Sequence, residues 1–548
     1  EVLNGPASVL YGEGAVGGAI NIVPKRPLTD RRRNEARVTA GTYGQRGLAV
    51  GSAGPINDAL AYNFDISGAA ADGWRDRDNT SSLAISGGLR WQASEDLAFT
   101  LSHDFGKARP STYFGTPLVD GRVDERVRRR NYNVSDALVR FRDNYTQLHA
   151  EWGVTENVTV NSRLYRLASD RDWRNVEDYV YNSGVVDREF YIAINHDLEQ
   201  IGNRTDATVE TTLWGMENTT TIGFDVNRIR FKNTNNSPYD GDSTVDFLNP
   251  KPGVFGPHVM KTTADLTTNQ YALFLDNRLK ITDQFSLVGG VRYDHLRVSR
   301  VDPEFTRNLS SVNWRIGAVY NPIPDVALYA QYSRAHEPIG NVLSLAESQA
   351  DLKLTKAQQQ EIGVKFSFLD GRGDATLSAY RIVKNDLLAR DPDDPNITRQ
   401  IGQQSSKGIE AAIGFDVTPT FRIDANGALL SPRYDDYVQE AGNFSGNRPP
   451  NAPRHVVNIW GSWEFAPGWT ARAGAHHVAE AFTNAANTTT RPSYTIVNAG
   501  LQWKPRENLS LDLNVYNLTD KIYATSGGAD QWLLGPPRSA TLDLSVSF

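Results

Sequence analysis

The sequence contains no cysteine and only two methionines among its 548 residues. Without cysteine there is no disulfide framework and no thiolate chemistry. No run of about 18 consecutive apolar residues occurs, which excludes a transmembrane helix. The formal net charge is −7, so the chain lacks the basic excess with which nucleic-acid-binding proteins displace counterions from phosphates. We therefore expect no nucleic-acid partner.

A signal peptide is also missing from the sequence. Glu1 already lies in what reads as a folded, glycine-rich segment, so we expect the natural N-terminus to lie upstream. Intrinsic disorder is excluded by the 22 Tyr, 21 Phe and 11 Trp, because disordered chains carry few aromatic residues. We therefore expect the chain to fold, so the order of its apolar and polar residues can be used to predict secondary structure.

The dominant pattern in the sequence has a period of two residues. Near the C-terminus Ala540, Leu542, Leu544, Val546 and Phe548 alternate with polar residues, as in a strand with one apolar and one polar face. The same alternation occurs in residues 509–515 and 285–294. Helical spacing is nowhere sustained over three turns. These patterns predict an all-β protein.

Short turns separate pairs of long candidate strands, and longer polar stretches lie between them. The ten short turns are expected near Gly54–Asp58, Ala93–Asp96, Gly153–Asn157, Gly215–Asn218, Ile281–Gln284, Asn321–Asp325, Leu369–Asp374, Thr418–Thr420, Ala466–Gly468 and Lys504–Asn508. If both chain ends lie on the short-turn side, ten such turns imply about 22 strands. Each strand with its connection then takes about 23–24 residues, more than the roughly 9–11 that cross a bilayer.

A soluble all-β protein is the alternative. Its strands would usually have about 3–10 residues, and its turns would recur about every 8–12 residues. The longer spacing here favours a transmembrane antiparallel β-barrel of about 22 strands, whose apolar face meets lipid and whose lumen is polar. We assign the barrel to residues 31–548, and residues 1–30 form a separate, glycine-rich segment. The expected location is the bacterial outer membrane, with many membrane-crossing strands.

Six stretches of sequence make the chain recognisable. Residues 1–27, EVLNGPASVLYGEGAVGGAINIVPKRP, resemble the end of the plug domain in TonB-dependent outer-membrane siderophore receptors. NLSLDLNVYNLTDKIYATSG followed by GPPRSATLDLSVSF resembles the last hairpin of that family. KAQQQEIGVKF, SSKGIEAAIGF and GNRPPNAPRHVVNIWGSWEF resemble its strand starts. The resemblance covers the whole chain, and departs from the family at Asn4 and Pro24.

The resemblance carries specific expectations. It implies a 22-stranded barrel with the C-terminal remnant of a plug, an N-terminally truncated chain without most of the plug or the TonB box, and a monomer. It implies import of a ferric siderophore driven by the TonB-ExbB-ExbD complex. Iron(III) would arrive as a siderophore chelate, with no cofactor bound directly. Further partners would be outer-membrane lipid and lipopolysaccharide.

Aromatic residues in the expected external loops are the candidate ligand site. Tyr179 and Tyr181 are two residues apart, so their rings lie on one side of an extended chain. Tyr113 and Phe114 follow the fifth strand, and Phe247 lies in another external loop, as do Tyr239, Phe255 and Trp532. Aromatic-lined sites suit a bulky chelate with an apolar periphery. The alternative is the aromatic girdle at the membrane interface.

The resemblance to receptors of the ferrichrome, or hydroxamate, type implies particular contacts. It assigns ligand contacts to Tyr11 in the SVLYG turn, to Phe114, and to the pair Tyr179 and Tyr181. Thr116 stands where that type has tryptophan, which weakens the case for ferrichrome itself.

Other motifs have simpler interpretations. Gly12, Gly14, Gly17 and Gly18 predict a turn with positive φ rather than a phosphate loop, because no Gly-Lys-Ser/Thr follows. Arg372–Asp374 falls on an expected short turn. The basic residues Arg126 and 128–130 would form a solvated loop, contact lipopolysaccharide or capture an anionic chelate.

The sequence shows neither a metal site nor a catalytic site. Adjacent residues on a strand face opposite sides, so His476 and His477 cannot chelate one ion together. Only His258 and His336 could serve haem in external loops. Because no catalytic constellation emerges, we expect no enzyme. The alternatives are a receptor for cobalamin, haem or a glycan, and a passive porin.

Overall fold

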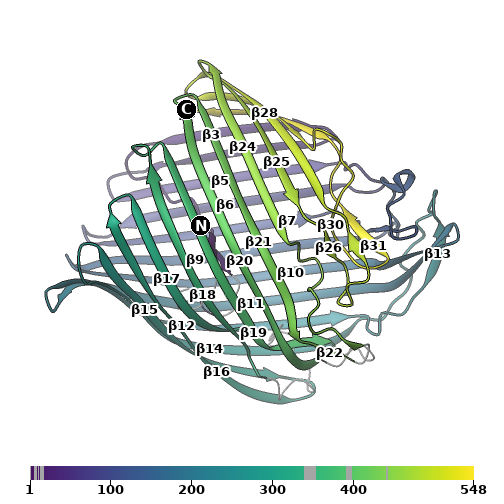
Figure 1. Ribbon diagram of the computed structural model, residues 1–548, viewed down its shortest axis with the longest axis horizontal. Helices are drawn as coiled ribbons and strands as arrows, with labels where there is room; N and C mark the ends of the chain where they lie inside the picture. The colour runs from purple at the N-terminus through teal and green to yellow at the C-terminus, as the bar shows by residue number, and fades with distance from the viewer. Residues whose placement is uncertain are drawn as a thin grey trace.

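The computed structural model describes residues 2–4, 9, 12, 18–337, 353–390, 398–439 and 442–548. Within these ranges, 22 antiparallel strands close into a barrel (Figure 1). This confirms the predicted fold class. In the same ranges, no helix has both the length and the apolar character required to cross a bilayer.

The barrel strands follow one another around the ring in chain order. The first eleven are β3 (Arg33–Gly41), β4 (Arg46–Pro55), β5 (Leu60–Ala71), β6 (Thr80–Gln92), β7 (Leu97–Arg109), β9 (Leu138–Thr155), β10 (Val158–Asn182), β11 (Val185–Leu213), β12 (Met216–Asn235), β14 (Lys261–Lys280) and β15 (Phe285–Arg300). The others are β16 (Phe305–Ile323), β17 (Val326–Glu337), β18 (Thr355–Phe368), β19 (Gly373–Arg390), β20 (Thr398–Thr418), β21 (Phe421–Asp436), β24 (His455–Ala466), β25 (Trp469–Val478), β28 (Tyr494–Arg506), β29 (Leu509–Tyr516) and β32 (Ser539–Ser547).

The short turns all connect consecutive barrel strands, from β4–β5 to β28–β29, at each of the ten predicted places. They lie at one end of the barrel, and the long connections lie at the other (Figure 1). β3 closes the ring by pairing with β32, from Glu35 opposite Ser547 to Gly41 opposite Thr541. Closure pairs the backbone groups of every strand, which a strand in lipid requires.

The two faces of the last strand are those predicted from its alternation. Leu542 and Leu544 are 43% and 46% exposed on the outer face. On the inner face, Asp543 Oδ1 accepts a hydrogen bond from Thr39 Oγ1 at 2.5 Å, and Ser545 accepts one from Arg37 at 3.1 Å. Apolar residues therefore face outward and polar residues bond across the lumen side of the seam.

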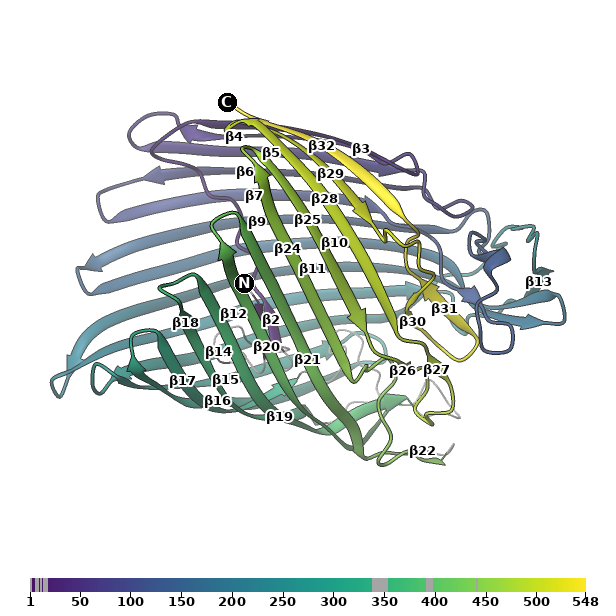
Figure 2. The same cartoon turned by 45° about the horizontal axis from the view of Figure 1, so that its top comes forward.

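The two longest barrel strands, β10 and β11, are neighbours on one side of the ring. β10 has 25 residues and β11 has 29, against nine in β3 and in β32. Their outer ends, with β13 (Ser243–Asp246) paired to β11, project beyond the neighbouring strands at the loop end (Figures 1 and 2). This projection is the framework of an external cap.

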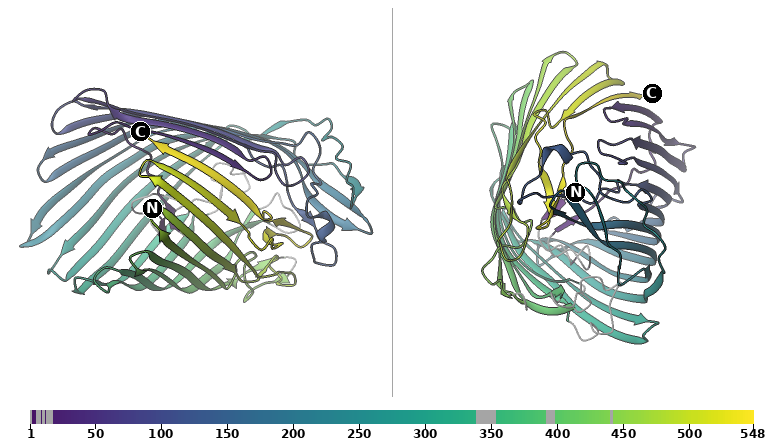
Figure 3. Two further views of the ribbon diagram at one scale, coloured as in Figure 1. Left: turned by 90° about the horizontal axis from the view of Figure 1, so that it is seen from above. Right: turned by 90° about the vertical axis from the view of Figure 1, so that its right-hand side faces the viewer.

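Small elements at the loop end complete the cap. β8 (Thr116–Pro117), β30 (Ala524–Gly527) and β31 (Gln531–Leu534) form a three-stranded sheet. Seen from the loop end, the β30–β31 hairpin lies within the outline of the ring (Figure 3, right). Two further pairs are β22 (Val438–Gln439) with β23 (Gly442–Asn443), and β26 (Ala481–Phe482) with β27 (Thr490–Arg491).

The described residues of the N-terminal segment lie inside the barrel (Figures 1 and 3). Its strands β1 (Val2–Asn4) and β2 (Gly18–Ile20) pair with each other. Val9 is 4% exposed, and a Cβ added to Gly290 on β15 would lie 2.8 Å from Val9 Cγ1. Gly12 has φ +80°, as its turn was predicted to need, and it lies against the Arg292 guanidinium.

Candidate ligand-binding site

The cap is built on a hydrophobic cluster outside the membrane-spanning part of the barrel. It brings together the β7–β9 connection, the outer ends of β10 and β11, and the β12–β14 connection. Its buried members are Val127, Tyr132, Val134, Val176, Tyr179, Val186, Tyr191, Ala193, Val245, Phe247 and Phe255, with Phe114, Val119, Ala137, Tyr181 and Met260 packed against them. We call this set the cap cluster.

Aromatic rings form the centre of the cap cluster. Tyr132 stacks on Phe247 at 6.4 Å between centroids and lies 5.9 Å from Tyr179. The Tyr132 hydroxyl donates to the Phe247 carbonyl at 2.6 Å, and the Tyr179 hydroxyl donates to the Val176 carbonyl at 2.7 Å. Burial raises the pKa of both phenols, so both remain neutral donors.

The partly exposed rings lie at the edge of this centre. Tyr181 meets Phe247 edge to face at 4.8 Å. Phe114 meets Trp173 of β10 edge to face at 5.7 Å. The indole nitrogen of Trp173 donates to Glu177, and burial raises the pKa of that carboxyl against the effect of this hydrogen bond. Phe114 and Tyr181 are therefore held by other rings while keeping surface exposed.

Tyr113 contacts the neighbouring sheet of β8, β30 and β31. Its hydroxyl lies 2.8 Å from Thr116 Oγ1 and donates to the Trp532 carbonyl at 3.2 Å. The Arg75 guanidinium is 3.6 Å from the ring centres of both Trp74 and Tyr113, so it lies against both aromatic rings. Burial raises the pKa of Tyr113 and lowers that of Arg75.

A buried arginine ties the cap connections together. Arg188 on β11 is 4% exposed. It donates to the Tyr132 carbonyl at 3.0 Å, the Pro252 carbonyl at 2.9 Å and Ser243 Oγ at 2.8 Å. One guanidinium thus bridges the β7–β9 and β12–β14 connections.

The structure brings four of the six predicted site residues into the cap cluster: Phe114, Tyr179, Tyr181 and Phe247. Tyr113 lies beside it, and Tyr11 is outside the described residues. Tyr179 has no exposed surface and Phe247 has 3%, so in this arrangement they pack the cap rather than line its surface. Tyr132 and Trp173 were not predicted from the sequence. Trp173 lies on the same strand as Tyr179 and Tyr181 at an even spacing from both, so the alternation of side chains could have indicated it.

The basic cluster on the β7–β9 connection is largely paired. η1 (Glu125–Val127) begins after Asp124, and Arg126 bonds Asp124 at 2.6 Å. Arg128 bonds Asp520 at 3.0 Å and Arg130 bonds Asp76 at 3.3 Å. The bond from Arg128 lowers the pKa of Asp520. These pairs neutralise three of the four arginines and tie the cap to the β5–β6 and β29–β32 connections.

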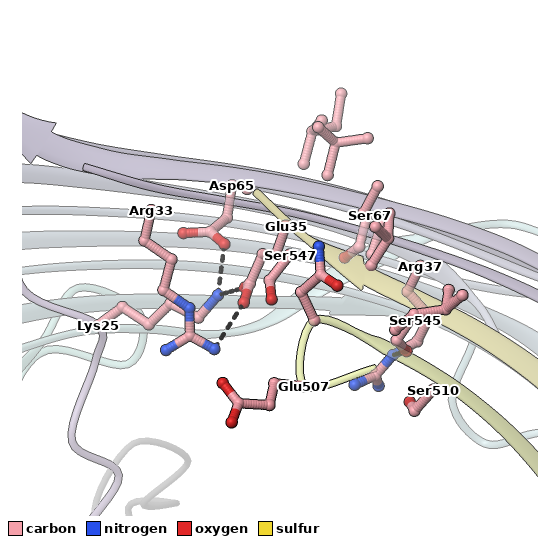
Figure 4. Close-up of a pocket in the computed structure, with 18 of the residues that line it drawn as sticks. Lys25, Arg33, Glu35, Arg37, Asp65, Ser67, Glu507, Ser510, Ser545 and Ser547 are labelled. Atoms are coloured by element: carbon pink, nitrogen blue, oxygen red, sulfur yellow. Dashed lines mark hydrogen bonds and ion pairs between the residues drawn. The ribbon is translucent and has the colours of Figure 1, made fainter. Parts of the chain in front are cut away.

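A second polar site lies in the lumen where the N-terminal segment enters the barrel wall. It is a cavity of about 590 Å³ between β3, β4, β5, β29 and β32 (Figure 4). Lys25 bonds Glu35 on β3, and Asp65 on β5 at 2.7 Å. The next residue, Arg26, bonds Glu151 on β9 at 3.1 Å, and Glu151 also pairs with Arg90 on β6. Residues 25 and 26 are thereby anchored to widely separated strands.

The histidines make no metal centre in the described part of the chain, where no three His, Cys, Asp or Glu side chains could hold an ion. His476 contacts Asn458 on the lumen side, whereas His477 stacks on His455 at 5.2 Å on the outer side. The two adjacent histidines therefore face opposite ways, as predicted. His336 is 8% exposed and bonds Asn313, and His258 packs on Phe255.

Comparison with known proteins matches residues 62–518 to the family described as TonB dependent receptor-like, beta-barrel. The metal-pseudopaline receptor CntO of Pseudomonas aeruginosa is 25% identical over 593 aligned residues, covering 100% of this chain and 80% of that protein. The ferrioxamine B receptor of Salmonella typhimurium is 26% identical over 592 aligned residues, with the same two coverages.

Solved structures share the architecture. The siderophore receptor PiuA of Acinetobacter baumannii superposes with a TM-score of 0.90 at 19% identity, covering 100% of this chain and 86% of that one. The closed form of the ferric-catecholate import receptor Fiu of Escherichia coli gives 0.88 at 19% identity, covering 100% and 85%. At these identities the likeness establishes the fold.

Proposed function

The chain belongs to the TonB-dependent receptor family, whose members are outer-membrane receptors and not enzymes, and we propose that it binds a ferric siderophore and imports it into the periplasm. Energy would come from TonB through the TonB-ExbB-ExbD complex. The observation that carries the proposal is the cap, where aromatic rings from two connections and from the outer ends of β10 and β11 meet over one end of a closed barrel. Relatives that are named as siderophore receptors and align with the whole chain support the proposal.

The proposed ligand site comprises Tyr11, Tyr113, Phe114, Tyr179, Tyr181 and Phe247. Phe114 and Tyr181 keep partly exposed rings and would contact the apolar periphery of the chelate directly. Tyr179 and Phe247 would act mainly by fixing those rings. The ligand would bring iron(III) already chelated. The relatives are named for pseudopaline, ferrioxamine B and catecholates, so their names do not select the hydroxamate type.

The proposed domain division places the end of a plug at residues 1–30 and the barrel at residues 31–548. Lys25 and Arg26 support it, because their ion pairs fix the end of this segment to the barrel wall. A pull on the preceding plug would then be resisted at residues 25 and 26. We also propose that the receptor acts as a monomer in contact with outer-membrane lipid and lipopolysaccharide.

Ligand titration tests the proposed substrate class. The receptor expressed from its natural gene is purified, and quenching of tryptophan fluorescence is followed with ferric hydroxamate, catecholate and carboxylate chelates. Haem, cobalamin and an oligosaccharide serve as comparisons. Saturable quenching by one ferric chelate class is expected. Saturation only by haem, cobalamin or the oligosaccharide would favour a receptor for another scarce ligand, and no saturation by any compound would favour a porin.

A further inference from the structure

The N-terminal segment contacts one strand of the barrel wall at two positions. Val9 is 4% exposed, and a Cβ added to Gly290 on β15 would lie 2.8 Å from Val9 Cγ1. Arg292 follows two residues later on β15, and a Cβ added to Gly12 would lie 3.2 Å from Arg292 Nη2. Residues two apart on a strand share a face, so both positions face the lumen. We call Gly290 and Arg292 the β15 seat.

The Arg292 side chain is buried and held by three strands. It is 1% exposed. Its Nε donates to Asp294 Oδ1 at 2.9 Å and to Oδ2 at 3.1 Å, and its Nη2 lies 3.6 Å from Asp225 Oδ2. The guanidinium carbon lies 5.8 Å from the ring centre of Phe274. These partners come from β15, β12 and β14, which are neighbours in the wall (Figure 1).

The carboxylate that orients Arg292 is itself fixed by hydrogen bonds. Asp294 accepts from Asn313 on β16 at 3.0 Å and from Gln270 on β14 at 3.3 Å. Asn313 Oδ1 in turn accepts from the backbone N–H of His336, at the end of β17, at 2.8 Å. Asn313 and Asp294 have no exposed surface. A continuous set of hydrogen bonds therefore runs from β17 through β16 to the guanidinium of the β15 seat.

The terminal nitrogens of Arg292 have donor capacity to spare. Among the described residues, none accepts a hydrogen bond from Nη1 or Nη2. A buried donor without an acceptor is costly, and more so on a charged group. Gly12, with φ +80°, has no Cβ that would hold the guanidinium away from the backbone of its turn. The β15 seat therefore offers two donors to the carbonyl groups of the turn that contains Gly12.

We propose that Arg292 is a positioning residue for the ligand site. It fixes the turn around Gly12, and with it Tyr11, the adjoining residue in the sequence. The inference rests on the proposed function, in which Tyr11 contacts the chelate. Arg292 is too deeply buried to touch a ligand, so it acts through the turn. The hydrogen bonds that reach Asp294 from Asn313 make the guanidinium a fixed support for that turn.

A double-mutant cycle on ligand binding tests this role. The full-length receptor from its natural gene carries Arg292→Lys, Tyr11→Ala or both. Tryptophan quenching is followed with the ferric hydroxamate, catecholate or carboxylate chelate that saturates the wild type. Arg292→Lys keeps the charge beside Asp294 but loses the planar group with two terminal nitrogens, so binding should weaken about fivefold or more. In the Tyr11→Ala background it should add less than about twofold, because residues that act through one contact are not additive.

Arg422→Lys is the matched control. Arg422 lies on β21, and its Nε likewise donates to the carboxylate two residues later, Asp424, at 3.0 Å and 3.1 Å. This change should alter chelate binding less than about twofold. Hydrogen exchange supplies a measurement that needs no chelate. The amides of Val9 and Gly12 should exchange faster in Arg292→Lys than in wild type, and at the wild-type rate in Arg422→Lys.

The outcomes separate a positioning role from a general effect on the barrel. Full additivity of Arg292→Lys and Tyr11→Ala would overturn the proposal. Equal effects of the two lysine variants, or unchanged exchange at Gly12, would also overturn it. Asn313→Ala leaves Arg292 intact and should speed exchange at Gly12 by a smaller factor. Heat-modifiable mobility shows that each variant is folded. Failure of the wild type to bind any chelate would count against the proposed function, and hydrogen exchange would then decide the role of Arg292 alone.

Discussion

The ring of Tyr181 meets the ring of Phe247 edge to face, with centroids 4.8 Å apart and planes at 65°. Tyr181 lies at the outer end of β10 and Phe247 lies in the β12–β14 connection, so the contact joins β10 to the segment after β13. Phe247 in turn stacks on Tyr132. A ring that keeps exposed surface is thus held by rings that do not, which is a preorganised arrangement for binding.

Replacing Tyr181 with Ala should weaken siderophore binding without affecting the barrel. Aromatic hot spots are typically worth about 2 kcal/mol or more, and about 1.4 kcal/mol corresponds to tenfold in affinity. The dissociation constant should therefore rise roughly tenfold or more in a tryptophan-quenching titration. Tyr320→Ala, which removes an exposed outer-face ring near a short turn, is the control and should not change it. An unchanged constant for both Tyr181→Ala and Phe114→Ala would exclude these rings as contacts.

Tyr179 should matter for the stability of the cap. Its ring is fully buried, and truncating a large buried aromatic residue costs about 3–5 kcal/mol. Tyr179→Ala should therefore greatly increase hydrogen exchange in the cap, including the amides of Tyr132 and Phe247. Tyr179→Phe keeps the ring and loses only the bond to Val176, so about 1 kcal/mol is expected. Equal exchange in the two variants would show that the ring does not support the cap.

Glu177 should make cap opening depend on pH. Burial raises its folded-state pKa above the ordinary value of 4.5, so the closed cap binds the proton more tightly than the open one. The resulting stabilisation is complete below about pH 4.5 and is lost as pH rises through the folded pKa. The protection factors of the cap amides in hydrogen exchange should therefore fall as pH rises from 4.5 through the folded pKa. Glu177→Gln should flatten this profile, and a variant as pH-dependent as wild type would refute the assignment.

The outward face of β32 can be tested by two neighbouring arginine substitutions. Leu544→Arg puts a charge on the lipid side and should cost roughly 2–4 kcal/mol near the bilayer midplane. Asp543→Arg faces the lumen, loses the bond from Thr39, and should cost much less. Unfolding of the reconstituted barrel in denaturant measures both. Equal destabilisation by the two changes would mean that the face assignment is wrong.

The barrel was predictable from local patterns. Period-two alternation at residues 540–548 fixes which side chains face lipid, and the short turns fix strand number, because both are properties of adjacent residues. The residue-by-residue pairing of neighbouring strands could be predicted only in part. The seam between β3 and β32 joins residues 35 and 547, and no local pattern reports that pairing.

The aromatic residues of the cap could be predicted from the sequence, but the role of each residue could not. Tyr179 and Tyr181 share strand parity, yet one is buried and the other partly exposed. The difference arises from Tyr132, which packs on Tyr179 from a distant connection. The ion pairs of Arg128 with Asp520 and Arg130 with Asp76 also join segments far apart in sequence. Such contacts depend on how loops fold onto one another, which one sequence does not encode locally.

Uptake of radiolabelled iron tests the central claim most directly. Cells that lack their other siderophore receptors express this receptor from its natural gene, with TonB intact or deleted, and receive the ferric chelate that binds in titration. We predict saturable accumulation of iron with TonB intact, and loss of that accumulation when TonB is deleted. Uptake that is non-saturable, or equal with and without TonB, would contradict energy-dependent siderophore import by this barrel.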